Sequence, residues 1–314
     1  MSDLTRFIEY ARAFEFAQAS DDFSLIEPFF APGARHDVEG VAPFVGAAAG
    51  RDAVVAGLRA SVHEIDRRFD TRIPEVLEGP ELRDDGVWMR FGLRLCRAGL
   101  PDVFIEGEHT TVYDDAGQIV RIDERMLGGT DIRARDFLSE NDAALRPAGS
   151  PPLAPAGERL PTLRDAFQRT LVRFYGVAKS HQDIDAVLAV CHPCFTIDTA
   201  PFGIETRDRD DTAGALGFFF SVFPDYRALG TGIASGADGA AWWGRIVLTF
   251  GGELLGHAPT GRSAELDAVS VFEFRDGLIA REHFQFDLGT LCDQIGLPVS
   301  ELSEALRSLR AQAA

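Results

Sequence analysis

Apolar positions recur with a helical period near the start of each half of the chain. In the second half, Phe167, Leu171, Phe174 and Tyr175 fall on one face of an amphipathic helix. Similar patterns continue along both halves. They predict helices over 4–19, 23–30 and 52–62 in the first half, and over 163–180, 184–191 and 211–223 in the second.

Runs rich in β-branched and aromatic residues follow the helices. They predict strands over 87–96, 103–113 and 119–126 in the first half, and over 241–250, 264–274 and 278–286 in the second. Arg275-Asp276-Gly277 predicts a hairpin turn between the last two strands, because Asp-Gly suits the positive φ angles of tight hairpins. Helices followed by antiparallel strands predict an α+β architecture in each half.

The two halves resemble each other in sequence. Segment 22–32 aligns without gaps on segment 183–193, and Asp37 falls over Asp198 at the same offset. Between the halves, segment 146–161 is dense in proline, which disfavours both helix and sheet. We therefore predict one domain repeated in tandem, over 1–145 and 162–314, with 146–161 as a linker.

Composition narrows the choice of partners. A net charge of -18 disfavours nucleic acid and anionic membrane surfaces. Four cysteines in 314 residues favour a reducing compartment, and no secretory signal or membrane-spanning run is visible. We expect a soluble, cytoplasmic protein that acts on a small molecule.

Several kinds of chemistry find little support in the sequence. Lys179 is the only lysine, and the polar stretch 179–183 is typical of a solvated helix end, so a Schiff-base role is not expected. Cys191-His192-Pro193-Cys194 follows a predicted helix rather than opening one, and no second pair supplies zinc ligands. No nucleotide-binding glycine loop is present. We expect neither metal nor cofactor.

Five motifs in the second half occur in a familiar order: 223–227, 256–262, 272–279, 282–287 and 291–297. This series resembles the SnoaL-like polyketide cyclases of the nuclear transport factor 2-like superfamily. The first half resembles the superfamily more loosely and lacks the Pro-Thr-Gly-Arg loop of 259–262. The resemblance implies two cone-shaped domains, each a curved antiparallel sheet wrapped around helices with an apolar pocket. It also implies sheet-to-sheet pairing, here as an intramolecular pseudo-dimer, with further homo-oligomers left open.

The resemblance implies that Asp287 is a general acid/base. Alternation along the strand puts His283, Gln285 and Asp287 on one face and Phe284 on the other, and we expect the polar set to face the pocket. An apolar cavity would raise the pKa of an aspartate into the range useful for proton transfer. The alternative is that Asp287 caps a helix beginning at residue 288.

Other residues could join this site. His283 and His257 are the next catalytic candidates. Strand parity leaves open whether four further residues reach the pocket with Gln285: Asp267, Trp243, Arg245 and Asp198. In the first half, the hairpin alignment puts Leu127 over Asp287, so the candidate acid is missing there. Asp123, Arg125, Glu108 and His109 could form a different polar pocket in that half, or that domain could serve only to pair and stabilise. We favour the second half as the catalytic one.

These observations predict a cofactor-independent acid/base enzyme for a small apolar carbonyl or aromatic substrate. A cyclase, isomerase, dehydratase or carbon–carbon lyase would fit, by a logic like that of ketosteroid isomerase. The alternative is a non-catalytic ligand-binding or protein-interaction module, because a fold does not determine its function.

Overall fold

The computed structural model describes residues 1–154 and 159–313. The chain divides into two compact units, unit 1 (Met1–Thr170) and unit 2 (Leu171–Ala314), and each is described by itself. Residues 155–158 of the predicted linker lie outside the described residues. The domain boundaries and the pseudo-dimer drawn from the sequence stay predictions.

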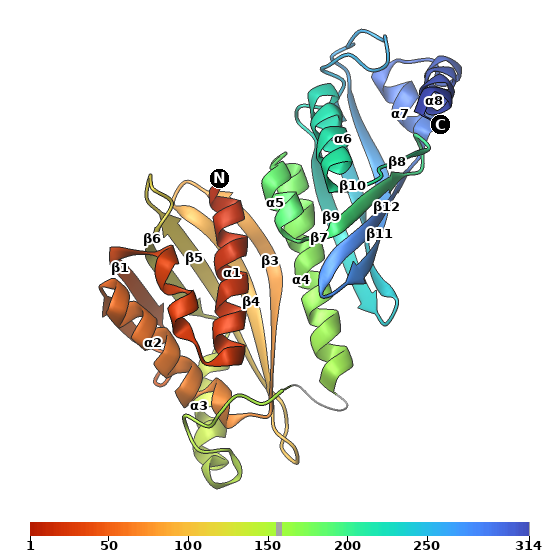
Figure 1. The fold of residues 1–314 in the computed structure, drawn as a ribbon. Coiled ribbons are helices and arrows are strands. Elements are labelled where there is room, and N and C mark those ends of the chain that lie inside the picture. The colour runs from red at the N-terminus through yellow and green to blue at the C-terminus, as the bar shows by residue number, and fades with distance from the viewer. Residues whose placement is uncertain (155–158, 314) are drawn as a thin grey trace. The chain divides into compact units, whose positions relative to one another are not determined.

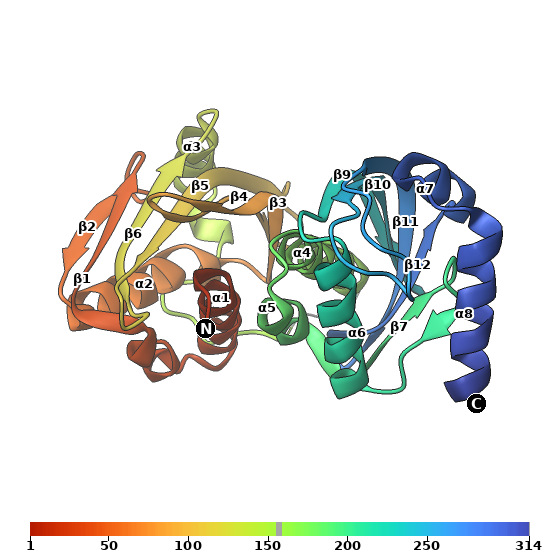
Figure 2. The ribbon, with the colours of Figure 1, turned by 90° about the horizontal axis from the view of Figure 1, so that it is seen from above.

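Unit 1 is a six-stranded sheet with helices against one face (Figures 1 and 2). Its elements are α1 (Asp3–Ser20), η1 (Phe23–Leu25), η2 (Glu27–Phe29), β1 (Phe30–Glu39), β2 (Gly46–Ala49), α2 (Arg51–Glu64), η3 (Asp66–Arg68), β3 (Thr71–Arg83), β4 (Gly86–Cys96), β5 (Val103–Tyr113), β6 (Ile119–Met126), α3 (Thr130–Glu140) and η4 (Asp142–Ala144). The strand order is β2-β1-β6-β5-β4-β3. Buried side chains of α1 and α2, such as Tyr10 and Val54, pack on Phe30 and Ile122 of the sheet.

Unit 2 repeats this arrangement (Figure 1). Its elements are α4 (Leu160–Ser180, which begins in unit 1), α5 (Ile184–Ala189), β7 (Cys191–Thr199), β8 (Ile204–Glu205), α6 (Arg209–Val222), β9 (Arg227–Gly236), β10 (Gly239–Thr249), β11 (Ser263–Arg275), β12 (Leu278–Phe286), α7 (Leu288–Ile295) and α8 (Val299–Ala313). The strand order β8-β7-β12-β11-β10-β9 matches that of unit 1 position for position.

The predicted α+β class and tandem repeat are therefore confirmed. Asp37 pairs with Asp123 across β1 and β6, and Asp198 pairs with His283 across β7 and β12, in agreement with the sequence alignment. These two strand pairs are parallel, so each sheet is mixed rather than wholly antiparallel. The predicted helix at 23–30 is wrong: two short 3₁₀ turns lead into β1 there.

A β-bulge occurs at the same place in both sheets. In unit 2, Phe274 pairs with Ile279, but Glu273 pairs with Arg281, so Ala280 is an extra residue in β12. In unit 1 the corresponding extra residue is Val120 of β6. Because successive side chains alternate between faces, one extra residue moves every later side chain of the strand to the opposite face.

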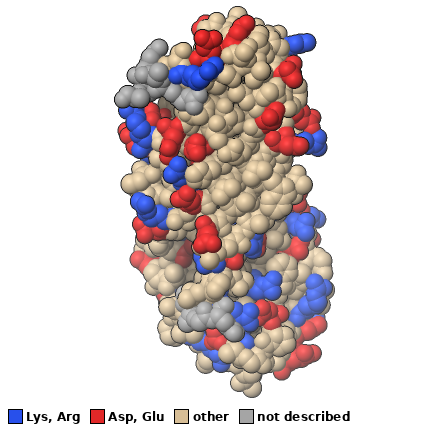
Figure 3. Space-filling model, turned by 90° about the vertical axis from the view of Figure 1, so that its right-hand side faces the viewer, with Lys and Arg blue, Asp and Glu red and all other residues tan. Residues whose placement is uncertain are grey.

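Both signs of charge are mixed on the face shown in Figure 3. Basic and acidic side chains lie next to one another there, around a broad area of uncharged residues. Within the described part of the chain, every helix is too short or too polar to cross a membrane.

Candidate functional site

A buried ionic cluster lies on the helix-covered face of the sheet in unit 2. Glu282 of β12 is 1% exposed and Lys179 of α4 is 5% exposed. The ammonium of Lys179 donates to both carboxylate oxygens of Glu282, at 3.0 and 3.2 Å. The hydroxyls of Tyr175 and Ser270 donate to the same carboxylate, at 2.5 and 2.7 Å. Glu282 is thus held by four hydrogen bonds from three side chains.

Aromatic rings surround the ammonium. Nζ of Lys179 lies 4.6 Å from the ring centroid of Phe284, 5.2 Å from that of Tyr175 and 6.0 Å from that of Tyr226. Burial, together with the Glu282 carboxylate, raises the pKa of Tyr175 well above its ordinary value, so the phenol stays a proton donor. The expectation that Lys179 is solvated is wrong, because its side chain packs back onto the face that carries Tyr175 one turn earlier.

The polar set of β12 lies on the face opposite to the one predicted. Phe284, expected to face outward, is 4% exposed and lies opposite buried Ser270. His283 lies on the outer face, where Nδ1 is 3.3 Å from Asp198 and Nε2 is 3.0 Å from Glu273. Asp198 therefore does contact His283, although on the outer face of the sheet.

Asp287 is the N-cap of α7. Its carboxylate accepts the backbone N–H of Thr290 at 2.6 Å. This hydrogen bond lowers the pKa of Asp287, which is the opposite of what an apolar pocket would do. The helix-cap alternative is the arrangement observed.

The other residues predicted for this pocket do not converge either. Trp243, Arg245 and Asp267 occupy outward-facing positions of β10 and β11, and Trp243 is 41% exposed. Gln285 is exposed as well. His257 lies in the loop after β10, where it exchanges two backbone hydrogen bonds with Leu254.

Two of the motifs behind the family resemblance have visible structural roles. The hydroxyl of Thr260, in the Pro-Thr-Gly-Arg loop, donates to the carbonyl of Ile295 at the end of α7. The side chain of Gln294 accepts from the N–H of Glu265 and donates to its carbonyl, at 2.8 and 3.0 Å. These contacts fasten α7 to its loop and to β11.

Unit 1 contains a second buried cluster, built around Glu124 of β6. Nδ1 of His109 lies 2.9 Å from one oxygen of Glu124, and Nε2 of His36 lies 3.7 Å from the other. Nε2 of His109 is 2.7 Å from the hydroxyl of Thr111. The sequence analysis named His109 but missed Glu124, which lies opposite it on β6, and His36 of β1, which lies beside Glu124.

Charge coupling is strong in this cluster. Burial opposes the charged form of Glu124, but His109 and His36 outweigh it and lower the pKa of Glu124 far below its ordinary value. Burial also opposes the charged form of His36, but Glu124, with Asp37 and Asp123, outweighs it and raises the pKa of His36. The cluster therefore favours an ionised carboxylate beside a protonated imidazole.

A pocket of about 640 Å³ lies next to this cluster. Six charged residues of β1, β5 and β6 line it: Asp37, Glu39, Glu108, Asp123, Glu124 and Arg125. Asp123 and Arg125, which the sequence analysis grouped as a polar pocket, thus share one cavity. His109 and the Glu124 carboxylate that it contacts lie on the opposite face of the sheet.

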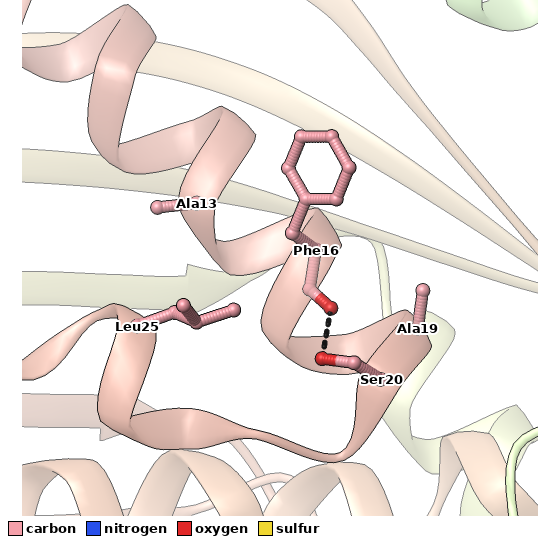
Figure 4. Close-up of a pocket in the computed structure, with 5 residues that line it drawn as sticks. All are labelled: Ala13, Phe16, Ala19, Ser20 and Leu25. Carbon is pink, nitrogen blue, oxygen red and sulfur yellow. Dashed lines mark hydrogen bonds between the residues drawn. The ribbon is translucent and has the colours of Figure 1, made fainter.

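A second pocket, of about 570 Å³, lies between α1 and η1 (Figure 4). It is lined by Ala13, Phe16, Ala19, Ser20 and Leu25, and the hydroxyl of Ser20 donates to the carbonyl of Phe16. None of these side chains can exchange a proton near neutral pH.

The two cysteines of the Cys191-His192-Pro193-Cys194 motif lie in different surroundings. Cys191 is buried and Cys194 is exposed, both on β7, and burial raises the pKa of Cys191 well above its ordinary value. Within residues 1–154 and 159–313, no group of three or more His, Cys, Asp or Glu side chains is placed to hold a metal ion.

Comparison with known proteins bears on unit 2. Residues 171–282 match the family described as SnoaL-like domain. Unit 2 contains a SnoaL-like domain. The match spans the ionic cluster from Tyr175 to Glu282. A comparison with curated proteins finds no match.

Several solved structures are similar in fold to this chain, and each match covers somewhat less than half of the chain. IdmH of Streptomyces antibioticus, titled "a putative polyketide cyclase", is 24% identical, with 41% of this chain and 99% of that one covered and a TM-score of 0.37. A SnoaL-like protein of Jannaschia sp. CCS1, titled a "Putative SnoaL-like polyketide cyclase", is 16% identical, with 46% and 99% covered and a TM-score of 0.40. An NTF2-like protein of unknown function from Burkholderia pseudomallei is 19% identical, with 41% and 97% covered and a TM-score of 0.37.

Proposed function

We propose that the protein is a cofactor-independent acid/base enzyme whose reaction takes place inside the SnoaL-like domain. The substrate would be a small, largely apolar carbonyl or aromatic compound, and the reaction a cyclisation, isomerisation, dehydration or carbon–carbon cleavage. The observation that carries the proposal is Glu282: a carboxylate on the inner face of the sheet, beside two hydroxyls and an ammonium and among aromatic rings.

Each group has a role in this proposal. Glu282 would take a proton from carbon next to a carbonyl and return it, as general base and acid. Lys179 would stabilise the negative oxygen that develops on the substrate, which a cation does strongly where water is excluded. Tyr175 and Ser270 are positioning residues that hold the carboxylate.

A general proton-transfer assay tests the proposal without knowledge of the natural substrate. Acetophenone and a cyclic aliphatic ketone are incubated with the protein in D₂O, and loss of the α-proton signal is followed by proton NMR. We expect exchange above the buffer rate, reduced roughly 10²- to 10⁴-fold in Glu282→Gln, the usual contribution of a general base. Tyr175→Phe and Ser270→Ala keep the ion pair and should lower the rate less.

Asp287→Asn and His283→Gln are the matched controls, since both lie outside the inner cluster. Exchange that survives Glu282→Gln in a folded protein, or that disappears in Asp287→Asn, would overturn this assignment.

A ligand-binding or structural module is the second candidate. The near-complete burial of the cluster favours it, since Glu282 and Lys179 leave little surface for a substrate. If the wild-type protein exchanges no probe above buffer while remaining folded, this second candidate holds instead.

A further inference from the structure

His36 and His109 contact the same carboxylate of unit 1 in different ways. Nδ1 of His109 is 2.9 Å from Glu124 and its Nε2 is 2.7 Å from the hydroxyl of Thr111, so a neutral imidazole satisfies both contacts. Nε2 of His36 is 3.7 Å from Glu124, beyond hydrogen-bond distance, and it has no hydrogen-bond partner among the described residues. The attraction between His36 and Glu124 therefore depends on a protonated, charged His36.

The groups around His36 favour its charged form. Burial opposes the charge, but the carboxylates of Glu124, Asp37 and Asp123 outweigh it and raise the pKa of His36. Tyr10 of α1 stays a neutral phenol, because burial and the charge of Glu124 raise its pKa. The buried side chains of α2, and the residue of β2 paired with His36, are apolar: Val54, Val55, Leu58, Val62 and Ala48.

The end of β1 has few other inward contacts. Phe30 and Ala34 are buried in the core, but after Ala34 the only buried residue of β1 is His36. β2, which pairs with 35–38, is exposed apart from the half-buried Ala48. Phe44 anchors the loop between the two strands. Between these anchors, segment 35–39 therefore makes its one buried contact through His36.

We propose that His36 and Glu124 form a pH-sensitive latch, which holds residues 35–39 of β1 in the sheet while His36 is protonated and releases them when His36 is neutral. A neutral His36 loses its attraction to Glu124 and keeps a buried nitrogen without a partner, so local opening to water becomes more favourable. Asp37 and Glu39 of the same segment line the 640 Å³ pocket on the other face of the sheet. Release of the latch would therefore remove one wall of that pocket.

The direction of the pH effect follows from the proton affinity of the two states. The pKa of His36 is raised in the closed sheet and returns to its ordinary value when the segment opens. Below that ordinary value, about 6.5, both states hold the proton and the latch contributes fully. As pH rises through the higher value of the closed state, this contribution is lost. Segment 35–39 should thus open more often as pH rises.

Hydrogen exchange of the full-length protein measures this opening. Exchange is followed by mass spectrometry where its rate reports the opening equilibrium, and is corrected for the intrinsic effect of pH. We expect the protection of 35–39 to fall roughly threefold or more from about pH 6 to about pH 8.5. In His36→Gln, which cannot carry the charge, protection should already be low at the lower pH and should not fall further. Glu124→Gln removes the other member of the latch and should also abolish the pH dependence, which gives a second test if His36→Gln does not fold.

His63→Gln is the matched control. His63 also contacts a carboxylate of unit 1, that of Asp21 at 2.7 Å, but it lies on α2, and its variant should keep the wild-type pH dependence at 35–39. Residues 86–96 of β4 report opening of the whole unit and should change much less. Constant protection of 35–39 in the wild type, a wild-type pH dependence in His36→Gln, or an equal fall in β4 would overturn the proposal. None of these outcomes involves the ketone exchange assay, so either proposal can fail without the other.

Discussion

A charge can be buried only where partners replace the water it loses. Lys179 is an example: its ammonium donates hydrogen bonds to two carboxylate oxygens, and three aromatic rings lie around it. Its neighbours in sequence are polar, which is why the sequence alone predicted a solvated side chain. Only the tertiary position of Glu282 reverses that prediction.

Removing one member of the Lys179–Glu282 pair should therefore lower the free energy of unfolding more than removing both members. We expect Lys179→Met to lower the free energy of unfolding by about 3–5 kcal/mol, because it leaves Glu282 charged and buried without a counter-ion. The double variant Lys179→Met with Glu282→Leu should recover most of this loss. Urea unfolding of the three proteins measures the difference.

Arg245→Gln is the control for this prediction, since the Arg245–Glu265 pair is more than half exposed on the arginine side and should contribute little. If the double variant is no more stable than Lys179→Met, the two residues are not coupled as described.

At the scale of elements, local pattern predicted the regular strands well. The ends of β5, β6 and β12 agree with the predicted ranges to the residue. By contrast, β3 and β9 were missed. β3 contains Pro74 and Pro80, and β9 is interrupted by glycines, so neither carries the apolar alternation by which a strand is recognised. Pairing with β4 and β10 stabilises both strands regardless of their local preference.

The candidate site was harder to predict than the fold. The correct strand, β12, was identified, but its polar set was assigned to the inner face on the resemblance at Asp287, whereas Glu282 and Phe284 lie inside. Alternation within one strand separates its two faces but does not say which of them is covered. The alternation along β11, where Ala264, Leu266 and Ala268 are buried, was the available clue to the inner face.

The cap of α7 gives a prediction at this scale. Asp287→Ala should lower the free energy of unfolding by about 1 kcal/mol, because the N–H of Thr290 loses its acceptor. Asp287→Asn, which can still accept that hydrogen bond, should lose less. Thermal or urea unfolding measures both variants. A destabilisation of Asp287→Asn as large as that of Asp287→Ala would contradict a capping role.

At the scale of the whole molecule, the two units share a fold but bury different sets of ionisable side chains. Unit 1 places imidazoles and a carboxylate inside, whereas unit 2 places an ammonium and a carboxylate there. The scaffold is repeated, but the inner ionisable groups are not. This is why a family resemblance centred on unit 2 gives no information about the cluster in unit 1.

The boundary between the units can be tested with fragments. Within unit 1, the first turns of α4 pack Ala166 on Ile73, and the hydroxyl of Thr170 accepts the N–H of Val76 at 3.1 Å. A fragment of residues 1–170 should therefore melt about 5 °C or more above one of residues 1–145, the domain predicted from the sequence. Circular dichroism measures both. Equal melting temperatures would favour the boundary predicted from the sequence.

The bulge at Ala280 also bears on how this protein could change over evolutionary time. Substitutions alter an inner surface one side chain at a time. Loss of a single codon near this hairpin would instead exchange all the inner and outer side chains of β12 at once, bringing His283 and Gln285 inside in place of Glu282 and Phe284. A single insertion or deletion at this hairpin can thus replace all the inner side chains of β12 in one step. In homologues with a hairpin of different length, residues of β12 should be matched by the face of the sheet on which they lie, because sequence alignment alone would pair inner with outer positions.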